Sequence, residues 1–210
     1  MPERSVVAQP RRGRKRAIAD RAEIRTAAAE LFAEQGYRAT GVRDIADSLG
    51  TSTSSVYSHV DSKAELLDEI VLDTLGALLA IQREAQASTS DPVQQLRRAA
   101  EAQVRYFVAH PTESIVAIRE FRWAEGDRLA EIMRLRLEYR DGFISMLIRG
   151  SAEGRMRVEN AKIAAFSIIE MAEAVPTWFK PDREFSANQI AYLYAEYALR
   201  IVGVYTNPAT

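Results

Sequence analysis

The sequence of residues 40–67 is TGVRDIADSLGTSTSSVYSHVDSKAELL, and this stretch decides the fold. Its first part places apolar residues at positions i, i+3, i+4 and i+7, namely Val42, Ile45, Ala46 and Leu49. This spacing predicts a helix with one buried face. We expect Thr40 to cap it and Gly50 to end it, because glycine tolerates a positive φ. A second short helix, about residues 52–59, completes a helix-turn-helix pattern.

The second helix of this pattern is almost free of large apolar residues apart from Val56 and Tyr57. Its other side chains are mainly Ser and Thr, with His59 at the end. Hydroxyls and ring nitrogens of this kind contact phosphate oxygens and base edges in the major groove of DNA. The sequence therefore predicts that this helix faces duplex DNA rather than a protein core.

The run ATGVRDIADSLGTSTSSVYSHVDSKAELL resembles the DNA-binding motif of the TetR family of transcriptional regulators. In that family Thr, Ile-Ala, Gly-x-Ser, Tyr-x-His and Ser-Lys-x-x-Leu recur at this spacing. Upstream, RAEIRTAAAELFAEQGYRAT resembles the first helix of the same domain, so the likeness covers about residues 17–78. Two positions depart from the usual pattern: Ser54 replaces a common glycine or proline, and Val60 replaces a phenylalanine.

The resemblance implies roles for individual residues. The residues expected to contact base edges lie at the start of the second helix: Thr51, Ser52, Thr53, Ser54 and Ser55. The residues expected to contact phosphates are Thr40, Tyr57, His59 and Lys63, and Arg43 could contact either a base or a phosphate. Two alternatives stay open: Tyr57 as a half-buried packing residue, and His59 as an ordinary helix end.

The net charge of −1 hides an uneven distribution along the chain. Residues 1–63 carry 11 Lys and Arg against 8 Asp and Glu, whereas the remainder carries 17 against 21. Residues 1–16 include Arg11, Arg12 and Arg14 and are expected to form a flexible basic arm that follows phosphates or enters a minor groove. The alternative is a solvated, disordered tail.

Composition excludes several classes of function. The chain has no cysteine, which rules out disulfides, thiolate catalysis and the common zinc-finger ligand sets. The only histidines are His59 and His110, and neither a metal-spaced carboxylate set nor a glycine-rich phosphate loop is present. No apolar run approaches the roughly 20 residues that span a bilayer. We therefore expect a cytoplasmic protein that is not an enzyme, binds no cofactor or metal, and has no membrane partner.

The remaining sequence predicts helices and no strands. Periodic apolar residues and end signals place the helices of the whole chain at about residues 17–35, 41–49, 52–59, 63–79, 91–110, 112–124, 127–153, 161–179 and 186–202. This order matches the all-α TetR architecture. It implies a helix-turn-helix domain of three helices (residues 17–63) after the arm (1–16), and a six-helix domain for ligand binding and dimerisation (64–210).

A single helix-turn-helix contacts too few base pairs to be specific, so we expect a homodimer on a palindromic operator in double-stranded DNA. In the family the last two helices form the dimer interface. The expected interface residues are Ile168, Met171, Val175, Tyr194, Tyr197 and Ile201. The predicted helix at residues 161–179 is apolar on nearly all sides, which fits this role.

The resemblance also implies control by a small-molecule effector, with repression as the usual outcome. The candidate ligand-binding residues are large and apolar: Phe107, Phe121, Trp123, Met133, Leu137, Phe143, Met146, Phe166 and Trp178. Any of these could instead be ordinary core. The stretch TWFKPDREFSANQIAYLYAEYALR resembles the KstR-type branch, repressors that respond to acyl-CoA esters. The effector is therefore expected to be hydrophobic, an acyl-CoA or an aromatic or lipid-like compound. The alternative is a regulator that binds DNA or a partner without any ligand.

Overall fold

The computed structural model describes residues 20–181 and 184–205, and every regular element in these ranges is helical. Their order is α1 (Arg21–Gln35), α2 (Val42–Leu49), α3 (Thr53–Tyr57), α4 (Lys63–Ala87), α5 (Pro92–Ala109), α6 (Pro111–Arg119), the 3-10 helix η1 (Phe121–Trp123), α7 (Gly126–Ala152), α8 (Ala161–Glu173), α9 (Val175–Trp178) and α10 (Ala187–Ile201). The predicted all-α fold is confirmed. The predicted basic arm, with Arg11, Arg12 and Arg14, lies outside the described residues.

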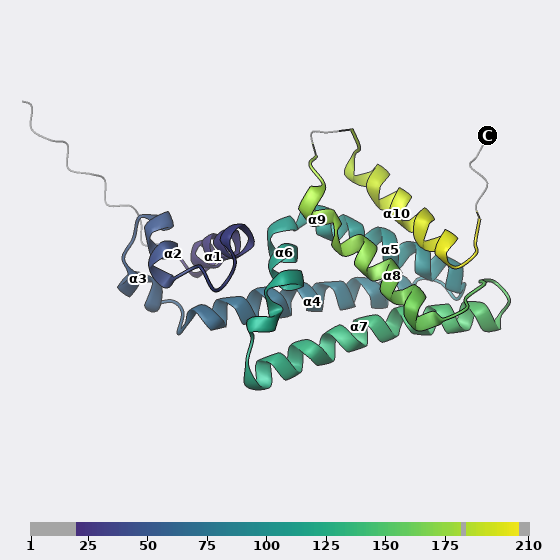
Figure 1. Ribbon diagram of the computed structural model, residues 1–210, viewed down its shortest axis with the longest axis horizontal. Coiled ribbons are helices and arrows are strands. Elements are labelled where there is room, and N and C mark those ends of the chain that lie inside the picture. The colour runs from purple at the N-terminus through teal and green to yellow at the C-terminus, as the bar shows by residue number, and fades with distance from the viewer. Residues whose placement is uncertain (1–19, 182–183, 206–210) are drawn as a thin grey trace, which may run out of the picture.

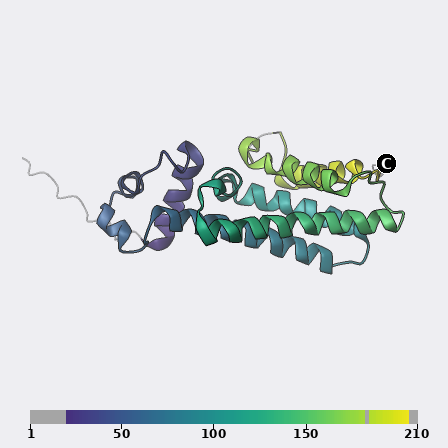
Figure 2. The same ribbon diagram turned by 60° about the horizontal axis from the view of Figure 1, so that its bottom comes forward.

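Helices α1, α2 and α3 gather at one end of the molecule, and the long helix α4 runs from them along the other helices (Figure 1). Figure 2 shows α8 and α10 as a layer on the side of the bundle away from α4. Helix α10 packs along α5, and α4 packs on α5, α6 and α7. Helix α4 therefore runs continuously from the helix-turn-helix end into the rest of the bundle.

Several helix ends follow directly from local sequence. The hydroxyl of Ser62 accepts a hydrogen bond from the Glu65 N–H and caps α4, and Asp91 with Pro92 starts α5. Gly50 ends α2 at φ 63°, in the left-handed region that glycine adopts easily. One expected cap is wrong: Gly41, not Thr40, is the N-cap of α2.

The predicted helix over residues 161–179 is interrupted. Helix α8 ends at Glu173, and α9 begins at Val175 with Pro176 in its first turn. Proline has no N–H to donate, and its ring crowds the carbonyl one turn earlier, so a continuous helix across this position is disfavoured. The predicted helix over residues 112–124 likewise ends early, at Arg119, and η1 follows.

Two hydrophobic cores lie within the described residues. One joins α1, α2 and α3 to the first half of α4, up to Leu75, and extends to Val116 of α6 and Ile132 of α7. The other joins the second half of α4 to α5, α7, α8, α9 and α10. The helix-turn-helix end therefore shares its core with three helices of the larger domain.

Helices α4 and α7 approach closely. The Gln82 amide donates to the Tyr139 carbonyl at 2.7 Å, and the Gln86 amide donates to the Gly142 carbonyl at 3.1 Å. A Cβ atom at position 142 would lie 2.1 Å from Gln82 Oε1, so a larger residue there would displace the Gln82 side chain. The contact fixes the far half of α4 on α7.

Candidate DNA-binding surface and ligand cavity

Helix α3 presents a polar, exposed face. Thr53, Ser54 and Tyr57 are exposed, whereas Val56 is fully buried and anchors the helix in the core. Ser52 caps α3 by accepting from the Ser55 N–H at 3.2 Å, and its hydroxyl also lies 2.8 Å from that of Ser54. The hydroxyls expected at base edges therefore stand together at the start of the helix, with Thr51 and Ser55 partly covered.

Thr40 differs from its expected role. Its side chain is 1% exposed, and its hydroxyl donates to the Gly36 carbonyl at 2.9 Å and accepts from the Gln35 amide. The hydroxyl is used within the domain, which leaves none at the surface for a phosphate. Arg43, in contrast, is 85% exposed and pairs only loosely with Asp47, at 3.7 Å.

Lys63 joins the first turn of α4 to the turn between α1 and α2. Its ammonium donates to the carbonyls of Tyr37 and Thr40 at 2.8 and 2.7 Å and lies 4.1 Å from the centre of the Tyr37 ring. Burial lowers the pKa of Lys63, and the nearby Arg38 adds to the effect. Two of its three N–H groups are therefore occupied, and a phosphate contact would use the third.

A cavity of about 210 Å³ lies in the larger domain, enclosed by α4, α5, α6, α7 and α8. Its apolar lining includes Leu75, Leu78, Phe107, Met133, Leu137 and Phe166. Met133, Leu137 and Phe166 are each about two-fifths exposed, so apolar side chains also rim its opening between α7 and α8. Predominantly apolar concave sites of this kind suit small organic ligands.

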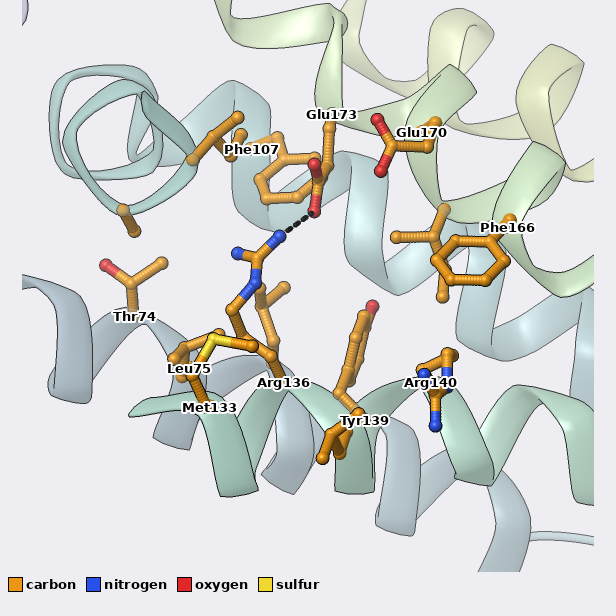
Figure 3. A pocket seen from close by; sticks show the side chains of 15 residues that line it. Thr74, Leu75, Phe107, Met133, Arg136, Tyr139, Arg140, Phe166, Glu170 and Glu173 are labelled. Carbon is orange, nitrogen blue, oxygen red and sulfur yellow. Dashed lines mark ion pairs between the residues drawn. The ribbon is translucent and has the colours of Figure 1, made fainter. Parts of the chain in front are cut away.

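Charged side chains from α7 and α8 face each other across this cavity. Figure 3 shows Arg136 and Glu173 extending toward one another, and their closest atoms are 3.9 Å apart. Burial raises the pKa of Glu173 to about 7; Arg136 opposes the shift, and Glu170 adds to it. Arg140 also lines the cavity but pairs with Asp141 at 2.8 Å. The site thus offers hydrogen-bonding groups of both charges beside an apolar space.

The structure brings only part of the predicted ligand set to this cavity. Phe107, Met133, Leu137 and Phe166 line it, and the other five lie elsewhere. Phe143 and Met146 are fully buried in the core, and Trp178 stacks on Tyr194 of α10. Periodicity alone cannot separate a core position from a cavity wall, because both face the interior of the bundle. The cavity residues that the sequence did not indicate include Thr74, Arg136, Tyr139, Glu170 and Glu173.

Phe121 and Trp123 connect the cavity region to the helix-turn-helix end instead of lining it. The Arg136 guanidinium lies 4.3 Å from the centre of the Phe121 ring, and that of Arg38 lies 4.8 Å from the Trp123 ring. Both distances are within the range of cation–π attraction. Arg136 therefore contacts both a cavity carboxylate and η1.

The expected dimer residues divide into two groups. Ile168 and Val175 are buried within the protomer, so they serve its own core, contrary to expectation. Tyr197 and Ile201 of α10 are more than two-fifths exposed, and Met171 and Tyr194 are intermediate. Ile163 of α8, which the sequence did not single out for this face, is 64% exposed. An exposed apolar surface on α8 and α10 therefore remains.

Two other features bear on the class of protein. Among the described residues, no set of three or more His, Asp or Glu side chains is arranged to hold a metal ion. No helix in residues 20–181 and 184–205 has the length and apolar character to cross a bilayer.

Comparison with known proteins identifies the family. Residues 24–70 match the family model "Bacterial regulatory proteins, tetR family", and residues 89–202 match "Tetracyclin repressor-like, C-terminal domain". The HTH-type transcriptional repressor KstR2 of Rhodococcus jostii (strain RHA1) is 32% identical over 185 residues, which cover 85% of this chain and 89% of that protein.

Solved structures agree with this assignment. The ketosteroid transcriptional regulator KstR2 of Mycobacterium tuberculosis superposes with a TM-score of 0.80 at 30% identity, over 86% of this chain and 93% of that one. AibR, solved in complex with isovaleryl coenzyme A and operator DNA, gives a TM-score of 0.76 at 25% identity, over 85% and 97% of the two chains. The chain therefore belongs to the TetR family of helix-turn-helix transcriptional regulators and is not an enzyme.

Proposed function

We propose that this regulator is a repressor that binds a palindromic operator as a homodimer and is released by a small hydrophobic effector. The observation that carries the proposal is the apolar cavity of about 210 Å³ against α4, the helix that directly follows the DNA-facing helix α3. A ligand that binds one arrangement of the two domains better shifts the DNA-binding equilibrium by that difference in affinity.

The contacts to DNA come from the exposed start of α3 and from cations around it. Thr53, Ser54 and Tyr57 lie on its accessible face, and Arg43 is free to reach a phosphate or a base. Six of the eleven cations in residues 1–63 precede residue 17. We infer that this basic segment supplies much of the sequence-independent, salt-sensitive part of the affinity.

The effector is a compound with a small apolar part, of which an acyl-CoA ester is the leading candidate. The cavity is smaller than the roughly 300–1,000 Å³ of sites that bury drug-sized ligands, so it suits an acyl or aromatic group rather than a whole coenzyme. The complex of AibR with isovaleryl coenzyme A supports this class. Arg136 and Arg140 provide donors for the polar part of such a ligand.

The exposed apolar surface on α8 and α10 supports dimerisation. Ile163, Tyr197 and Ile201 would be covered by the same surface of a second copy, as a two-fold symmetric interface requires. Dimerisation would place two copies of α3 about one turn of DNA apart, which is the spacing of a palindromic operator.

The test begins with selection of a preferred duplex from a random pool, followed by measurement of protomer number by light scattering. DNA affinity is then measured with isovaleryl-CoA, octanoyl-CoA, free coenzyme A and aromatic acids. We expect a dimer, a palindrome, and at least one compound that weakens binding about tenfold, equivalent to roughly 1.4 kcal/mol. A monomer without preference for any palindrome would refute the proposal, and a dimer unaffected by every compound would favour a ligand-independent regulator.

A pair of variants assigns the response to the cavity. Leu137→Trp places a bulky ring at the rim, and Ile148→Trp places the same ring at an exposed position of α7 that does not line the cavity. We expect only Leu137→Trp to abolish the response to the active compound, with DNA binding itself retained. An equal response in both variants would place the effector elsewhere.

A further inference from the structure

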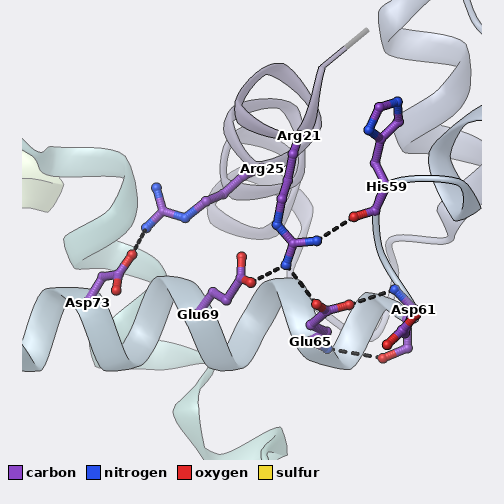
Figure 4. Close-up of polar contacts among 8 residues, drawn as sticks. Arg21, Arg25, His59, Asp61, Glu65, Glu69 and Asp73 are labelled. Atoms are coloured by element: carbon purple, nitrogen blue, oxygen red, sulfur yellow. Dashed lines mark hydrogen bonds and ion pairs between the residues drawn. The ribbon is translucent and has the colours of Figure 1, made fainter.

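Arg21, the first residue of α1, contacts three acceptors from two other segments. Its guanidinium donates to the backbone carbonyl of His59, to the Glu65 carboxylate at 2.7 Å, and to the Glu69 carboxylate (Figure 4). The hydrogen bonds to Glu65 and Glu69 raise the pKa of Arg21, and the hydrogen bond from Arg21 lowers the pKa of Glu65. One side chain of α1 therefore joins His59, two residues after the end of α3, to the first two turns of α4.

The segment between α3 and α4 is short, and both of its ends depend on this cluster. Only residues 58–62 separate the two helices. Arg21 contacts the His59 carbonyl, while Glu65, itself bound to Arg21, accepts from the Asp61 N–H at 2.6 Å. Figure 4 shows the His59 imidazole directed away from the cluster, so His59 contributes its backbone and not its ring. The Arg21 guanidinium and the Glu65 carboxylate therefore both hold this segment, together with the buried Val60 side chain and the Ser62 cap of α4.

Arg25 provides an internal comparison. It lies one turn after Arg21 on α1 and also pairs with α4, through Asp73 at 3.0 Å. Asp73 lies two turns beyond Glu65, far along α4 from the connection to α3. Pairing between α1 and α4 is thus common to both arginines, whereas the contact with the end of α3 belongs to Arg21.

We propose that Arg21 is a positioning residue for DNA recognition, which fixes the end of α3 on α4 and thereby sets the angle at which α3 meets the major groove. The inference rests on the proposed function, because it takes α3 as the helix that enters the groove. A tilted recognition helix keeps phosphate attraction but loses the base-edge geometry that gives specificity.

A direct contact of Arg21 with DNA phosphate is the competing role. The Arg21 side chain is 42% exposed, but it faces two carboxylates, Glu65 and Glu69, so the cluster carries more negative than positive charge. A phosphate approaching this cluster would meet net repulsion. The geometry therefore favours an internal role.

The experiment compares Arg21→Met with the matched control Arg25→Met, using the palindrome selected by the wild-type protein and a scrambled duplex of the same composition. Affinities for both duplexes are measured over a range of salt concentrations. For Arg21→Met we expect the ratio of specific to non-specific affinity to fall about tenfold, with the salt slope unchanged. For Arg25→Met we expect the wild-type ratio.

Two further variants keep the test decisive if Arg21→Met folds poorly. Arg21→Lys keeps the charge but cannot span three acceptors, so it should show a partial loss of specificity in a stable protein. Glu69→Gln should lower the ratio as well, and the double variant Arg21→Met with Glu69→Gln should lose little more than Arg21→Met alone, because both act through one contact.

Two results would overturn the inference. One is an unchanged affinity ratio in Arg21→Met and Arg21→Lys; the other is a salt slope that falls by about 0.9 in Arg21→Met, which marks a lost phosphate contact. If the wild-type protein itself showed no preference for any palindrome, the proposed function would fail first and the role of Arg21 with it.

Discussion

The backbone N–H of Tyr37, in the turn after α1, donates a hydrogen bond of 3.1 Å to the carboxylate of Glu120, directly after α6. The same carboxylate oxygen accepts from the indole N–H of Trp123, also at 3.1 Å. The Trp123 ring is covered in turn by Arg38. Glu120 thus ties the helix-turn-helix end to η1, the segment whose Phe121 ring lies under Arg136 of the cavity.

Replacement of Glu120 by alanine should expose the Tyr37 amide to hydrogen exchange. Within the described residues the Tyr37 N–H has no other acceptor, and we expect its exchange to be about tenfold faster. Glu120→Gln retains an acceptor oxygen and should keep most of the protection. The Gly36 amide, bonded to the Phe32 carbonyl at 3.1 Å, is the reference within the same turn. Equal acceleration of both amides would indicate general loosening of the turn instead.

Variants of Lys63 and Arg43 should distinguish a residue with a structural role from one that acts in DNA binding alone. Lys63→Met removes the two partly buried hydrogen bonds to the carbonyls of Tyr37 and Thr40, so the free energy of unfolding of this variant should fall by about 1–2 kcal/mol. If its third N–H meets a phosphate, as we expect, the salt slope of DNA binding also falls by about 1. Exposed Arg43, changed to Met, should alter DNA binding without altering stability. If Lys63→Met kept the wild-type salt slope of DNA binding, Lys63 would have only its internal structural role.

Glu173 should make stability depend on pH. Burial raises the folded-state pKa of Glu173 from about 4.5 to about 7. The contribution of Glu173 to the free energy of unfolding is therefore fully present below about pH 4.5 and is lost as pH rises through about 7. The loss is on the order of 3 kcal/mol. Glu173→Gln has no such titration, so it should gain stability relative to the wild type between about pH 5 and pH 8.

Urea unfolding at fixed protein concentration measures this difference between Glu173→Gln and the wild type. The groups that face Glu173 are Arg136 and Tyr139 on α7 and Glu170 on its own helix. Glu170 is exposed, so Glu170→Gln should change the pH dependence far less. If the difference in free energy of unfolding between Glu173→Gln and the wild type stayed constant between about pH 5 and pH 8, the expectation would be contradicted.

Gln103 should be a position where a leucine stabilises the protein. Its side chain is fully buried, and neither amide atom has a hydrogen-bond partner within the described residues. A buried amide without partners is unfavourable, so Gln103→Leu should raise the free energy of unfolding by about 1 kcal/mol or more. Gln82→Leu is the matched control, because Gln82 is also buried but donates to Tyr139, and it should destabilise. The prediction fails if both changes lower the urea midpoint.

The two functional regions differed in how far the sequence could predict them. The helix-turn-helix was predictable because its turn glycine and apolar spacing are local, and Gly50 and Val56 lie as that pattern indicates. The cavity was not, because its wall combines residues of five helices. Phe107 lines it while Phe143, equally apolar and equally buried, does not. The charged pair of Arg136 and Glu173 has no signal in sequence, since the two residues come from separate helices.

The sequence by itself determined the all-helical class, the family and the place of α3 in the helix-turn-helix, because these depend on periodicity and motif spacing within short stretches. Only the tertiary structure decided that Thr40 is buried and that Arg21 and Glu120 join α1 and its turn to α4 and α6. Such contacts depend on how whole helices pack against each other, and packing between distant segments is not encoded in any local pattern.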